Sequence, residues 1–495
     1  MNDSIKATPA PLLYQVVADR ITGLIDGNTF GPGDRLPSVR QLSQQMDVSL
    51  STVMEAYRRL EDGGRIEARP QSGYYVVEPA RAHNSKLNLE HNVNPAILPD
   101  EPALSRPSPG PTPITTRELT LRVMRHHNDP TLIPLGAAIP NPALLPVDKL
   151  NRTLARVIRQ VGAQGHIYDP PPGCEALRIQ VARRLVVAGC SLTPDQIVTT
   201  VGSQEAISLC LRAICKPGDT VAIESPIYYG ILQAIDLQGL RALEIPTHPQ
   251  TGISLDALEY ALEQNDVKAC VAIPNYSNPI GSLMPDENKR RLVEMLAGRS
   301  IPLIEDDIYG DLGHGSVRPK PAKAWDNTGN VLLCSSFSKT LSPGYRVGYV
   351  AAGRWQDQVE WHKIVTNLAT PLPTQLAVAD FLAEGGYDHH LRHVRRAYAR
   401  QTSLMGRAVG HYMPPGTKVT RPVGGFVLWV ELPVAIDALW LFERALSMGI
   451  SLAPGPMFSA RRRYGNYVRL NTAFWSPRVE EALEKLGSLL RDQAH

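Results

Sequence analysis

The stretch SSFSKTLSPGYR, residues 335–346, places one lysine, Lys339, among serines and ahead of an arginine. A lysine amine attacks an aldehyde only when it is partly deprotonated, so it needs a site that lowers its pKa. Ser336 and Ser338 offer neutral donors and Arg346 a forked donor, which together suit a phosphate group. A Schiff-base lysine beside a phosphate is what pyridoxal phosphate requires. Taken alone, the pattern also fits a surface lysine after a serine-rich turn.

Residues upstream of this stretch supply groups that could hold the ring of such a cofactor. Residues 304–309, IEDDIY, form an apolar run that ends in carboxylates. Asp306, at the expected C-terminal end of a strand, could pair with the protonated pyridine nitrogen. Tyr309 and Asn278 could both hydrogen-bond a phenolic ring oxygen. Each also has an ordinary structural explanation, such as a helix cap for Asp306 or a turn for Asn278.

Two further segments complete the set of candidate cofactor contacts. Ser203 and Gln204 begin a helical pattern, and free amides at a helix N-terminus suit a phosphate. Tyr228 offers a ring that could stack on the pyridine, although a core position would explain it equally well. The joint occurrence of these residues, in this order, favours the cofactor interpretation.

From about residue 116 onward, helical patterns alternate with short apolar runs, which predicts an α/β domain with a mostly parallel sheet. The clearest runs are Thr220–Ile223, Ala269–Ile273, Pro302–Ile304 and Val331–Cys334. Residues 79–115 are rich in proline, which removes hydrogen-bond donors and favours an extended tether. We therefore expect a separate domain over residues 1–78, a linker over 79–115 and a body over 116–495.

The N-terminal residues 1–78 have the pattern of a small helical domain that ends in a hairpin. An apolar stripe follows Pro11–Asp26, and Ser38 opens a second helix with Gln41 three residues later, as in a capping box. Ser49 can cap a third helix after a short connection, which predicts a helix-turn-helix. Two alternating runs, 65–69 and 73–77, predict a β-hairpin wing.

A DNA-binding role for this domain is not evident from its charge. Residues 1–78 hold eight Lys and Arg against ten Asp and Glu. The hydroxyls that begin the third helix could approach phosphates closely, but the arginines would also fit an ordinary solvated surface. Binding to DNA therefore requires the arginines to gather on one face.

The strings PGDRLPSVRQL, VSLSTVMEAYRRLEDGG and ARPQSGYYV resemble the GntR-family winged helix-turn-helix over nearly the whole domain. This resemblance implies double-stranded DNA as a partner. The residues it would place at or near DNA are Arg35, Ser38, Arg40, Ser49, Ser51, Thr52 and Gly73. Leu50 and Met54 occupy positions where many relatives carry basic residues, which leaves the operator sequence open.

Residues from about 130 to 490 resemble the fold-type I aminotransferases of class I/II, with a large subdomain over about 130–375 and a small one over about 376–495. The resemblance implies that Lys339 forms the Schiff base, Asp306 pairs with the pyridine nitrogen and Arg469 takes the substrate α-carboxylate. Tyr168 would reach the phosphate from the other subunit of a dimer. The remaining cofactor contacts it implies are Ser203, Gln204, Tyr228, Asn278, Tyr309, Ser336, Ser338 and Arg346.

A GntR-type head, a tether and an aminotransferase-like body form the layout that the MocR group of regulators has. The resemblance implies a homodimer with head-to-tail bodies, and a regulator that senses pyridoxal phosphate or an amino compound. Two alternatives stay open: a working aminotransferase with an accessory head, and a binding module whose effector is pyridoxal phosphate alone.

Composition is ordinary for a globular chain: 495 residues, 43% hydrophobic, 20% charged and a net charge of +3. The six cysteines show no CxxC spacing, so neither a metal site nor a disulfide framework is indicated. The first residues lack the pattern of a signal peptide, and no apolar run is long enough to span a membrane. We expect a cytoplasmic protein with no membrane partner.

Overall fold

The computed structural model describes residues 13–27, 29–31, 33–62, 65–69, 72–77, 99–126 and 129–493. The chain divides into two compact units, of which unit 1 holds residues 1–93 and 178–197, and unit 2 holds 94–177 and 198–495. Helix α6 (Glu175–Val187) crosses the boundary between them along the chain. None of the helices in these ranges is long and apolar enough to cross a membrane.

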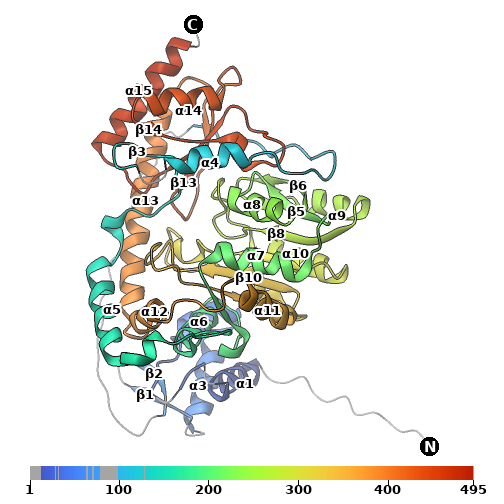
Figure 1. Ribbon diagram of the computed structural model, residues 1–495. Helices are drawn as coiled ribbons and strands as arrows, with labels where there is room; N and C mark the ends of the chain where they lie inside the picture. The colour runs from blue at the N-terminus through green and yellow to red at the C-terminus, as the bar shows by residue number, and fades with distance from the viewer. Residues whose placement is uncertain are drawn as a thin grey trace, which may run out of the picture. The chain divides into compact units, whose positions relative to one another are not determined.

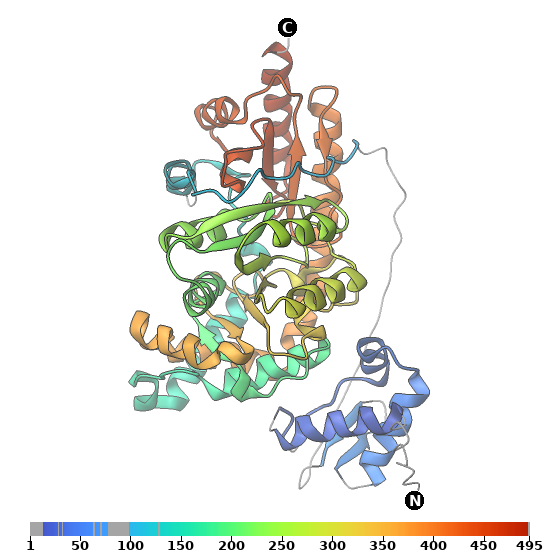
Figure 2. The same ribbon diagram turned by 90° about the vertical axis from the view of Figure 1, so that its right-hand side faces the viewer.

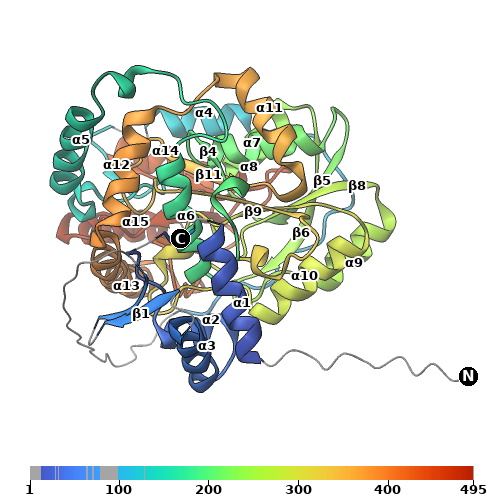
Figure 3. The same cartoon turned by 90° about the horizontal axis from the view of Figure 1, so that it is seen from below.

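The N-terminal part of unit 1 is a winged helix-turn-helix, as predicted (Figure 3). Its elements are α1 (Leu13–Asp26), α2 (Val39–Met46), α3 (Leu50–Asp62), β1 (Ile66–Arg69) and β2 (Gly73–Val76). The expected capping box starts α2, because Ser38 Oγ accepts from Gln41 N at 3.2 Å and Gln41 Oε1 accepts from Ser38 N at 3.1 Å. Ser49 Oγ likewise accepts from Thr52 N at 3.1 Å, at the first turn of α3.

The core of this small domain comes from one face of each helix. Ile21, Val53 and Tyr57 are buried, and the apolar spacing that predicted the helices is what brings them together. Tyr57 also donates from its hydroxyl to Pro37 O at 2.7 Å, which fixes α3 against the entry to α2. The antiparallel pairing of β1 and β2, with Ile66 opposite Val76, confirms the predicted hairpin.

A mixed eight-stranded sheet, mostly parallel, forms the centre of unit 2 (Figure 1). Its strands, in spatial order, are β4 (Val198–Thr200), β11 (Gly348–Ala351), β10 (Val331–Ser336), β9 (Leu303–Asp306), β8 (Val267–Ala272), β5 (Thr220–Ser225), β6 (Arg241–His248) and β7 (Gly252–Ile253). All four predicted apolar runs lie in this sheet, in β5, β8, β9 and β10, and adjacent members of the order β10-β9-β8-β5 pair in parallel. This arrangement confirms the predicted fold class.

Helices cover both faces of the sheet. They are α7 (Ser203–Ile214), α8 (Tyr229–Leu237), α9 (Leu255–Gln264), α10 (Asp286–Gly298), α11 (Gln356–Asn367) and α12 (Leu372–Ala383). Successive strand residues point to opposite faces. In β8, Ala269 and Val271 pack with α7 and α8, while Cys270 and Ala272 pack with α9 and α10. The central strands are therefore mostly apolar, as expected for a sheet buried on both faces, and their buried carboxyls lie toward the strand ends.

The remainder of unit 2 is a smaller α/β layer built around a four-stranded sheet. Its elements are α13 (Gly386–Tyr412), β12 (Lys418–Val419), β13 (Val427–Glu431), α14 (Ala438–Ser447), β14 (Ile450–Ser451), β15 (Ala453–Pro454), β16 (Tyr467–Asn471) and α15 (Pro477–Gln493). Strand β3 (Ile133–Pro134) pairs with β14. Residues near 130, which the sequence predicts to lie in the large subdomain, therefore pack with this smaller layer. Helix α5 (Val147–Val161) packs against α12.

Residues 99–115 cross the surface of unit 2 as an extended segment, here called the strap, and lead into α4 (Arg117–Arg125) (Figure 2). We predicted these residues to be part of the tether, but they belong to the body. Thr112 pairs with Ala242 through two backbone hydrogen bonds of 2.9 Å, and Ile114 is buried in the large core.

Three consecutive arginines hold the strap by its carbonyl oxygens. Arg461 donates to Gly110 O at 2.8 Å, and Arg463 donates to Arg106 O at 2.6 Å. Arg462 donates to Thr115 O at 2.8 Å. Proline removes backbone donors but leaves carbonyl acceptors, so an extended proline-rich segment is well suited to side-chain donors of this kind.

Candidate cofactor site and DNA-binding face

Lys339 follows the C-terminal end of β10, where parallel strands present side chains to a ligand. Its Nζ donates to Ala138 O at 2.6 Å. Burial and the nearby charge of Arg469 lower the pKa of Lys339 to about 8, against the opposing attraction of Asp306. The amine is therefore partly neutral near physiological pH, which is the state that reacts with an aldehyde.

Asp306 ends β9, the strand next to β10, and is buried. Its Oδ1 accepts from Ile308 N at 3.3 Å. Burial raises the pKa of Asp306 to about 7, and the attraction of Lys339 opposes that shift. A buried carboxyl with so little protein stabilisation of its charge is suited to pairing with a cationic N–H group.

Tyr309, Asn278 and Tyr228 lie around the same space. Tyr309 is buried and Tyr228 is partly buried, and both are close enough to Asp306 and to Arg469 for the charges of those residues to act on their hydroxyls. Asn278 Oδ1 accepts from Arg469 at 2.9 Å. The structure thus brings the predicted ring contacts together from three segments, which lie at the C-terminal ends of β5, β8 and β9.

The predicted phosphate contacts gather at the N-terminus of α7. Arg346 donates to Ser338 Oγ at 3.3 Å and to Val201 O at 2.9 Å, just ahead of Ser203. Gly202 has φ +81°, and a Cβ there would lie 2.5 Å from a guanidinium nitrogen of Arg346. Glycine is therefore required for this close approach between the arginine and the helix N-terminus.

The other two predicted phosphate ligands of the same chain lie beside this arginine. Ser336 Oγ accepts from Ser338 N at 3.3 Å. Gln204 donates to Gly230 O at 2.7 Å, and its Oε1 is buried without a hydrogen-bond partner among the described residues. Tyr168 is different: 77% of its surface is exposed. Its predicted role requires a second subunit.

Arg469 in β16 is buried and forms no ion pair with any described residue. It donates to Asn278 Oδ1 and to Gly136 O, while its Nε has no hydrogen-bond partner in the part of the chain that the structure describes. Burial lowers the pKa of Arg469. A buried guanidinium with spare donors is a receptor for a carboxylate.

Buried polar atoms that lack hydrogen-bond partners show whether these residues fit pyridoxal phosphate. Tyr309 Oη, Gln204 Oε1 and Arg469 Nε are buried without partners among the described residues, and they come from three separate segments. Buried polar atoms are ordinarily paired, so a cluster of unpaired ones indicates a bound polar group. The site offers an amine, a carboxyl for a ring nitrogen, a phenol and a phosphate cradle, which together match this cofactor.

Four of the DNA-facing residues predicted for the head are exposed (Arg35, Arg40, Ser49 and Ser51), and three are partly exposed (Ser38, Thr52 and Gly73). At the start of α3, Ser49 Oγ lies 2.7 Å from Ser51 Oγ and 2.8 Å from Thr52 Oγ1. The guanidinium of Arg35 lies against Gly73 in the hairpin, and Gly73 has φ +111°, where a side chain would be strained.

The predicted basic surface is smaller than the count of arginines indicates. Arg65 pairs with Asp26, and Arg69 pairs with Glu67 at 2.5 Å. Arg35 and Arg40 are exposed, and neither forms an ion pair with another described residue. Arg58 and Arg59 in α3 are likewise exposed and form no ion pair with another described residue, so these four arginines are available to phosphates.

Comparison with known proteins agrees with both halves of this description. Residues 13–76 match the bacterial regulatory proteins of the gntR family, and residues 141–486 match aminotransferase class I and II. The HTH-type transcriptional regulator YdcR of Escherichia coli is 39% identical to the chain, over 97% of this chain and 99% of its own length. The chain is a GntR-family transcription regulator with a class I and II aminotransferase domain.

The body of the regulator is similar to solved aminotransferases. LysN, the alpha-aminoadipate aminotransferase of Thermus thermophilus, superposes with a TM-score of 0.71 at 31% identity, covering 75% of this chain and 95% of that one. That enzyme was solved with N-(5'-phosphopyridoxyl)-L-leucine. Kynurenine aminotransferase of Pyrococcus horikoshii has the same TM-score at 29% identity, covering 77% and 95% of the two chains.

Sequence reasoning missed the segment of the regulator that faces Lys339 and Arg469. The carbonyls of Gly136 and Ala138 accept from these two side chains, and Asn471 holds the segment by donating to Ala137 O at 2.7 Å. The spacing of Arg469 and Asn471 could have indicated that both side chains contact one segment, because residues two apart in a strand share a face. Residues 136–138 contain no polar side chain that could have indicated their position.

The regulator shows no group of His, Cys, Asp and Glu arranged to hold a metal ion, within the residues that the structure describes. The cysteines described are free thiols, and five of the six are buried.

Proposed function

We propose that this regulator binds pyridoxal phosphate at Lys339 and that an amino compound arriving at the same site changes how its head binds DNA. The observation that carries the proposal is the cluster of Lys339, Asp306, Tyr309 and Arg469. Among the described residues, Tyr309 Oη and Arg469 Nε are buried without partners, Lys339 Nζ donates to a backbone carbonyl and Asp306 accepts from a backbone N–H. They belong to a chain that also has a GntR-type head.

The cofactor, when bound, supplies an aldehyde for covalent capture of amines and a ring that withdraws electrons. Residues of the chain would hold it at three points. Arg346 and the N-terminus of α7 would bind the phosphate, Asp306 would pair with the ring nitrogen and Tyr309 would hydrogen-bond the ring oxygen. Arg469 orients an incoming carboxylate, so that the amine of the same molecule is directed toward Lys339.

A second candidate function, amino-group transfer, is favoured by the same lysine. With a pKa of about 8, Lys339 Nζ can both accept and donate a proton near neutral pH, as a general base for such a reaction must. Release of a keto acid from the protein would distinguish amino-group transfer from ligand sensing.

We also propose a homodimer. Tyr168 is 77% exposed, as expected of a side chain whose predicted partner, a phosphate, lies on a second chain. Helix α11 also exposes Trp361, Ile364 and Val365, an apolar stripe at helical spacing that a second copy would cover. Light scattering of the full chain should give twice the mass of the 54.3 kDa protomer, whereas a monomer at micromolar concentration would contradict the dimer.

The strap provides a route from the ligand to the head within the described part of unit 2. Residues 78–98, between the strap and the head, lie outside the described residues. A ligand that binds beside α4 and alters its position would alter the strap that precedes it, and so the start of the connection to the head. Coupling requires only that the ligand prefer one arrangement of this segment over another.

We expect Arg40→Ala to weaken binding of the full chain to the DNA upstream of its own gene by roughly several-fold to tenfold at 0.15 M salt. The salt dependence of the affinity should fall by about one phosphate contact, and the cofactor content should be unchanged. Arg65→Ala is the matched control, because Arg65 already pairs with Asp26. Normal affinity and normal salt dependence in Arg40→Ala would remove Arg40 from the interface.

The strap is tested with the double variant Arg462→Gln and Arg463→Gln, which removes donors to Thr115 and Arg106. We expect the ratio of DNA affinities with and without a saturating amino acid to fall several-fold, because side chain–backbone hydrogen bonds of about 0.5–1.5 kcal/mol each are lost. Arg400→Gln, on the exposed face of α13, is the control. An unchanged ratio would mean that the coupling takes another route.

A further inference from the structure

Helix α3 of the head exposes a pair of apolar side chains in its first two turns. Leu50 is 49% exposed and Met54 is 56% exposed. Because they are four residues apart, they are neighbours on one side of the helix. In a helix-turn-helix, the N-terminal residues of the second helix contact base edges in the major groove of DNA. The apolar pair therefore occupies positions from which bases are recognised.

The core of the head fixes which side of α3 faces outward. Val53, Ala56 and Tyr57 are each 0% exposed. Tyr57 also donates from its hydroxyl to Pro37 O at 2.7 Å, which prevents the helix from turning about its axis. Leu50 and Met54 cannot be buried in the head without removing these residues from its core, so their exposed hydrocarbon is available to a partner.

The side chains of the first two turns differ in which bases they suit. Residues 50–57 contain no Lys, Arg, Asn or Gln. In the major groove, guanine is ordinarily recognised by Arg or Lys and adenine by Asn or Gln, whereas thymine is recognised by apolar contact with its C5-methyl group. Glu55 is exposed and can only accept hydrogen bonds, for which the amino group of adenine is a donor. A T·A pair offers both the methyl group and the amino group.

The cations of α3 come after the apolar pair. Arg58 and Arg59 are exposed and form no ion pair with another described residue. Arg58 is four residues beyond Met54, on the same side of the helix. Arginines contact the phosphates on both sides of a groove and set the position of a protein on the duplex, but such contacts carry no sequence information. Recognition of bases is thus left to the uncharged start of the helix.

We propose that Leu50 and Met54 contact the C5-methyl groups of thymines in the major groove, and that the operator of this regulator has T·A pairs opposite the first two turns of α3. The inference goes beyond the proposed function, because it rests on the binding of DNA by the head and does not require the response to an amino compound.

The test compares two forms of the DNA upstream of the regulator's own gene, one normal and one with every thymine replaced by deoxyuridine. Deoxyuridine pairs with adenine as thymine does and lacks only the methyl group. We expect the full chain to bind the deoxyuridine duplex roughly fourfold more weakly for each methyl group that is contacted, and 10- to 20-fold more weakly for two. Equal affinity for the two duplexes would overturn the inference.

The same comparison at two salt concentrations shows whether the loss comes from the methyl groups or from phosphate contacts. The ratio of the two affinities should be the same at about 0.15 M and 0.3 M salt, because the two duplexes carry the same phosphates. A ratio that falls toward one as salt is added would mean that the substitution alters phosphate contacts, and it would contradict direct recognition of the methyl groups.

Substitution of the pair assigns the effect to these residues. The double variant Leu50→Ser and Met54→Ser should bind both duplexes equally and unfold at the same temperature as wild type, because neither side chain is in the core. Leu13→Ser is the matched control, since Leu13 is a 64% exposed leucine on α1, and it should keep the full preference for thymine. A preference that persists in the double variant would mean that other residues recognise the methyl groups.

The outcomes separate this inference from the function of the head. A chain that binds the two duplexes equally well overturns the recognition of thymine alone. A chain that binds neither duplex overturns the binding of this DNA by the head, and with it the inference.

Discussion

Lys339→Ala should abolish covalent retention of pyridoxal phosphate. After borohydride reduction and denaturation, the wild-type chain should carry one cofactor by mass, and the variant none, because Lys339 is the amine placed beside the unpaired site atoms. The variant should also lose the response of DNA binding to amino acids. Its head is separate in the fold, so binding to DNA without ligand should stay within a few-fold of wild type.

The pH dependence of loading gives an independent check on the same lysine. The neutral fraction of an amine with a pKa of about 8 rises tenfold per pH unit below that value and levels off above it. The rate at which the cofactor-free chain reacts with pyridoxal phosphate should therefore rise to about pH 8 and then level off. Lys418→Ala, which removes a surface lysine paired with Glu431, is the control. A label that persists in Lys339→Ala would place the reaction at another lysine.

Asp306→Asn should weaken retention of the cofactor by roughly 10- to 150-fold. The change keeps the volume of the side chain but removes a charge-assisted hydrogen bond of about 1.5–3 kcal/mol to the ring nitrogen. The absorption spectrum of the bound cofactor should shift as well. Asp437→Asn, at the exposed cap of α14, is the matched control. An unaltered spectrum and affinity would mean that the ring nitrogen is paired elsewhere.

The same substitution has an effect on the cofactor-free chain that follows from burial. Burial raises the pKa of Asp306 to about 7, from about 3.9 in an unfolded chain. Between these values the native chain binds the proton and the unfolded chain does not, so the contribution of Asp306 to the free energy of unfolding falls as the pH rises. Unfolding measured from pH 4 to 7 should show a smaller fall in Asp306→Asn than in wild type.

Much of the fold could be predicted because its signals are local. The capping box of Ser38 and Gln41 lies within one helical turn, and the apolar runs of the sheet are continuous in the chain. The same holds for the stretch around Lys339, where the lysine and the arginine of the phosphate cradle are seven residues apart.

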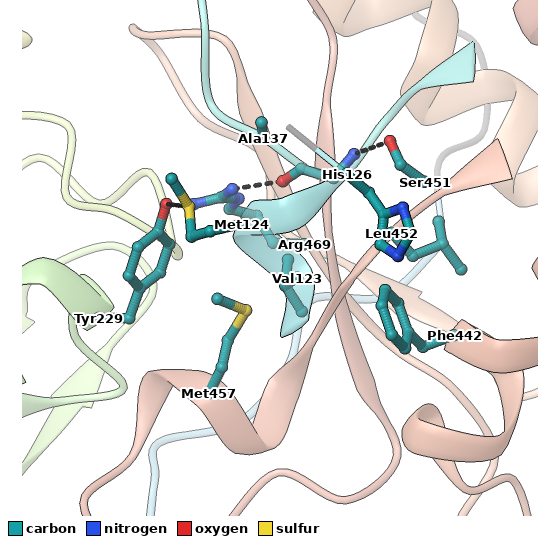
Figure 4. Close-up of a pocket in the computed structure, with 11 residues that line it drawn as sticks. Val123, Met124, His126, Ala137, Tyr229, Phe442, Ser451, Leu452, Met457 and Arg469 are labelled. Atoms are coloured by element: carbon teal, nitrogen blue, oxygen red, sulfur yellow. Dashed lines mark hydrogen bonds between the residues drawn. The ribbon is translucent and has the colours of Figure 1, made fainter. Parts of the chain in front are cut away.

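The strap and the packing of α4 on the small subdomain could not be predicted, because both depend on contacts between distant segments. The prolines of residues 99–115 indicated an extended chain, but nothing in them indicated that Arg461, Arg462 and Arg463 would hold it. Likewise, Val123 and Met457 are separated by more than 300 residues and meet only through the packing of α4 on the small subdomain (Figure 4). Such contacts require the tertiary structure.

The most direct test of a ligand-sensing regulator records three signals in one titration. The full chain, loaded with cofactor and bound to fluorescent promoter DNA, is titrated with each of a panel of amino acids while cofactor absorption, DNA anisotropy and keto-acid release are followed. We expect absorption and DNA affinity to change with the same midpoint and no keto acid to accumulate. Continuous release of keto acid, with DNA affinity unchanged, would contradict this expectation and show that the body works as an aminotransferase.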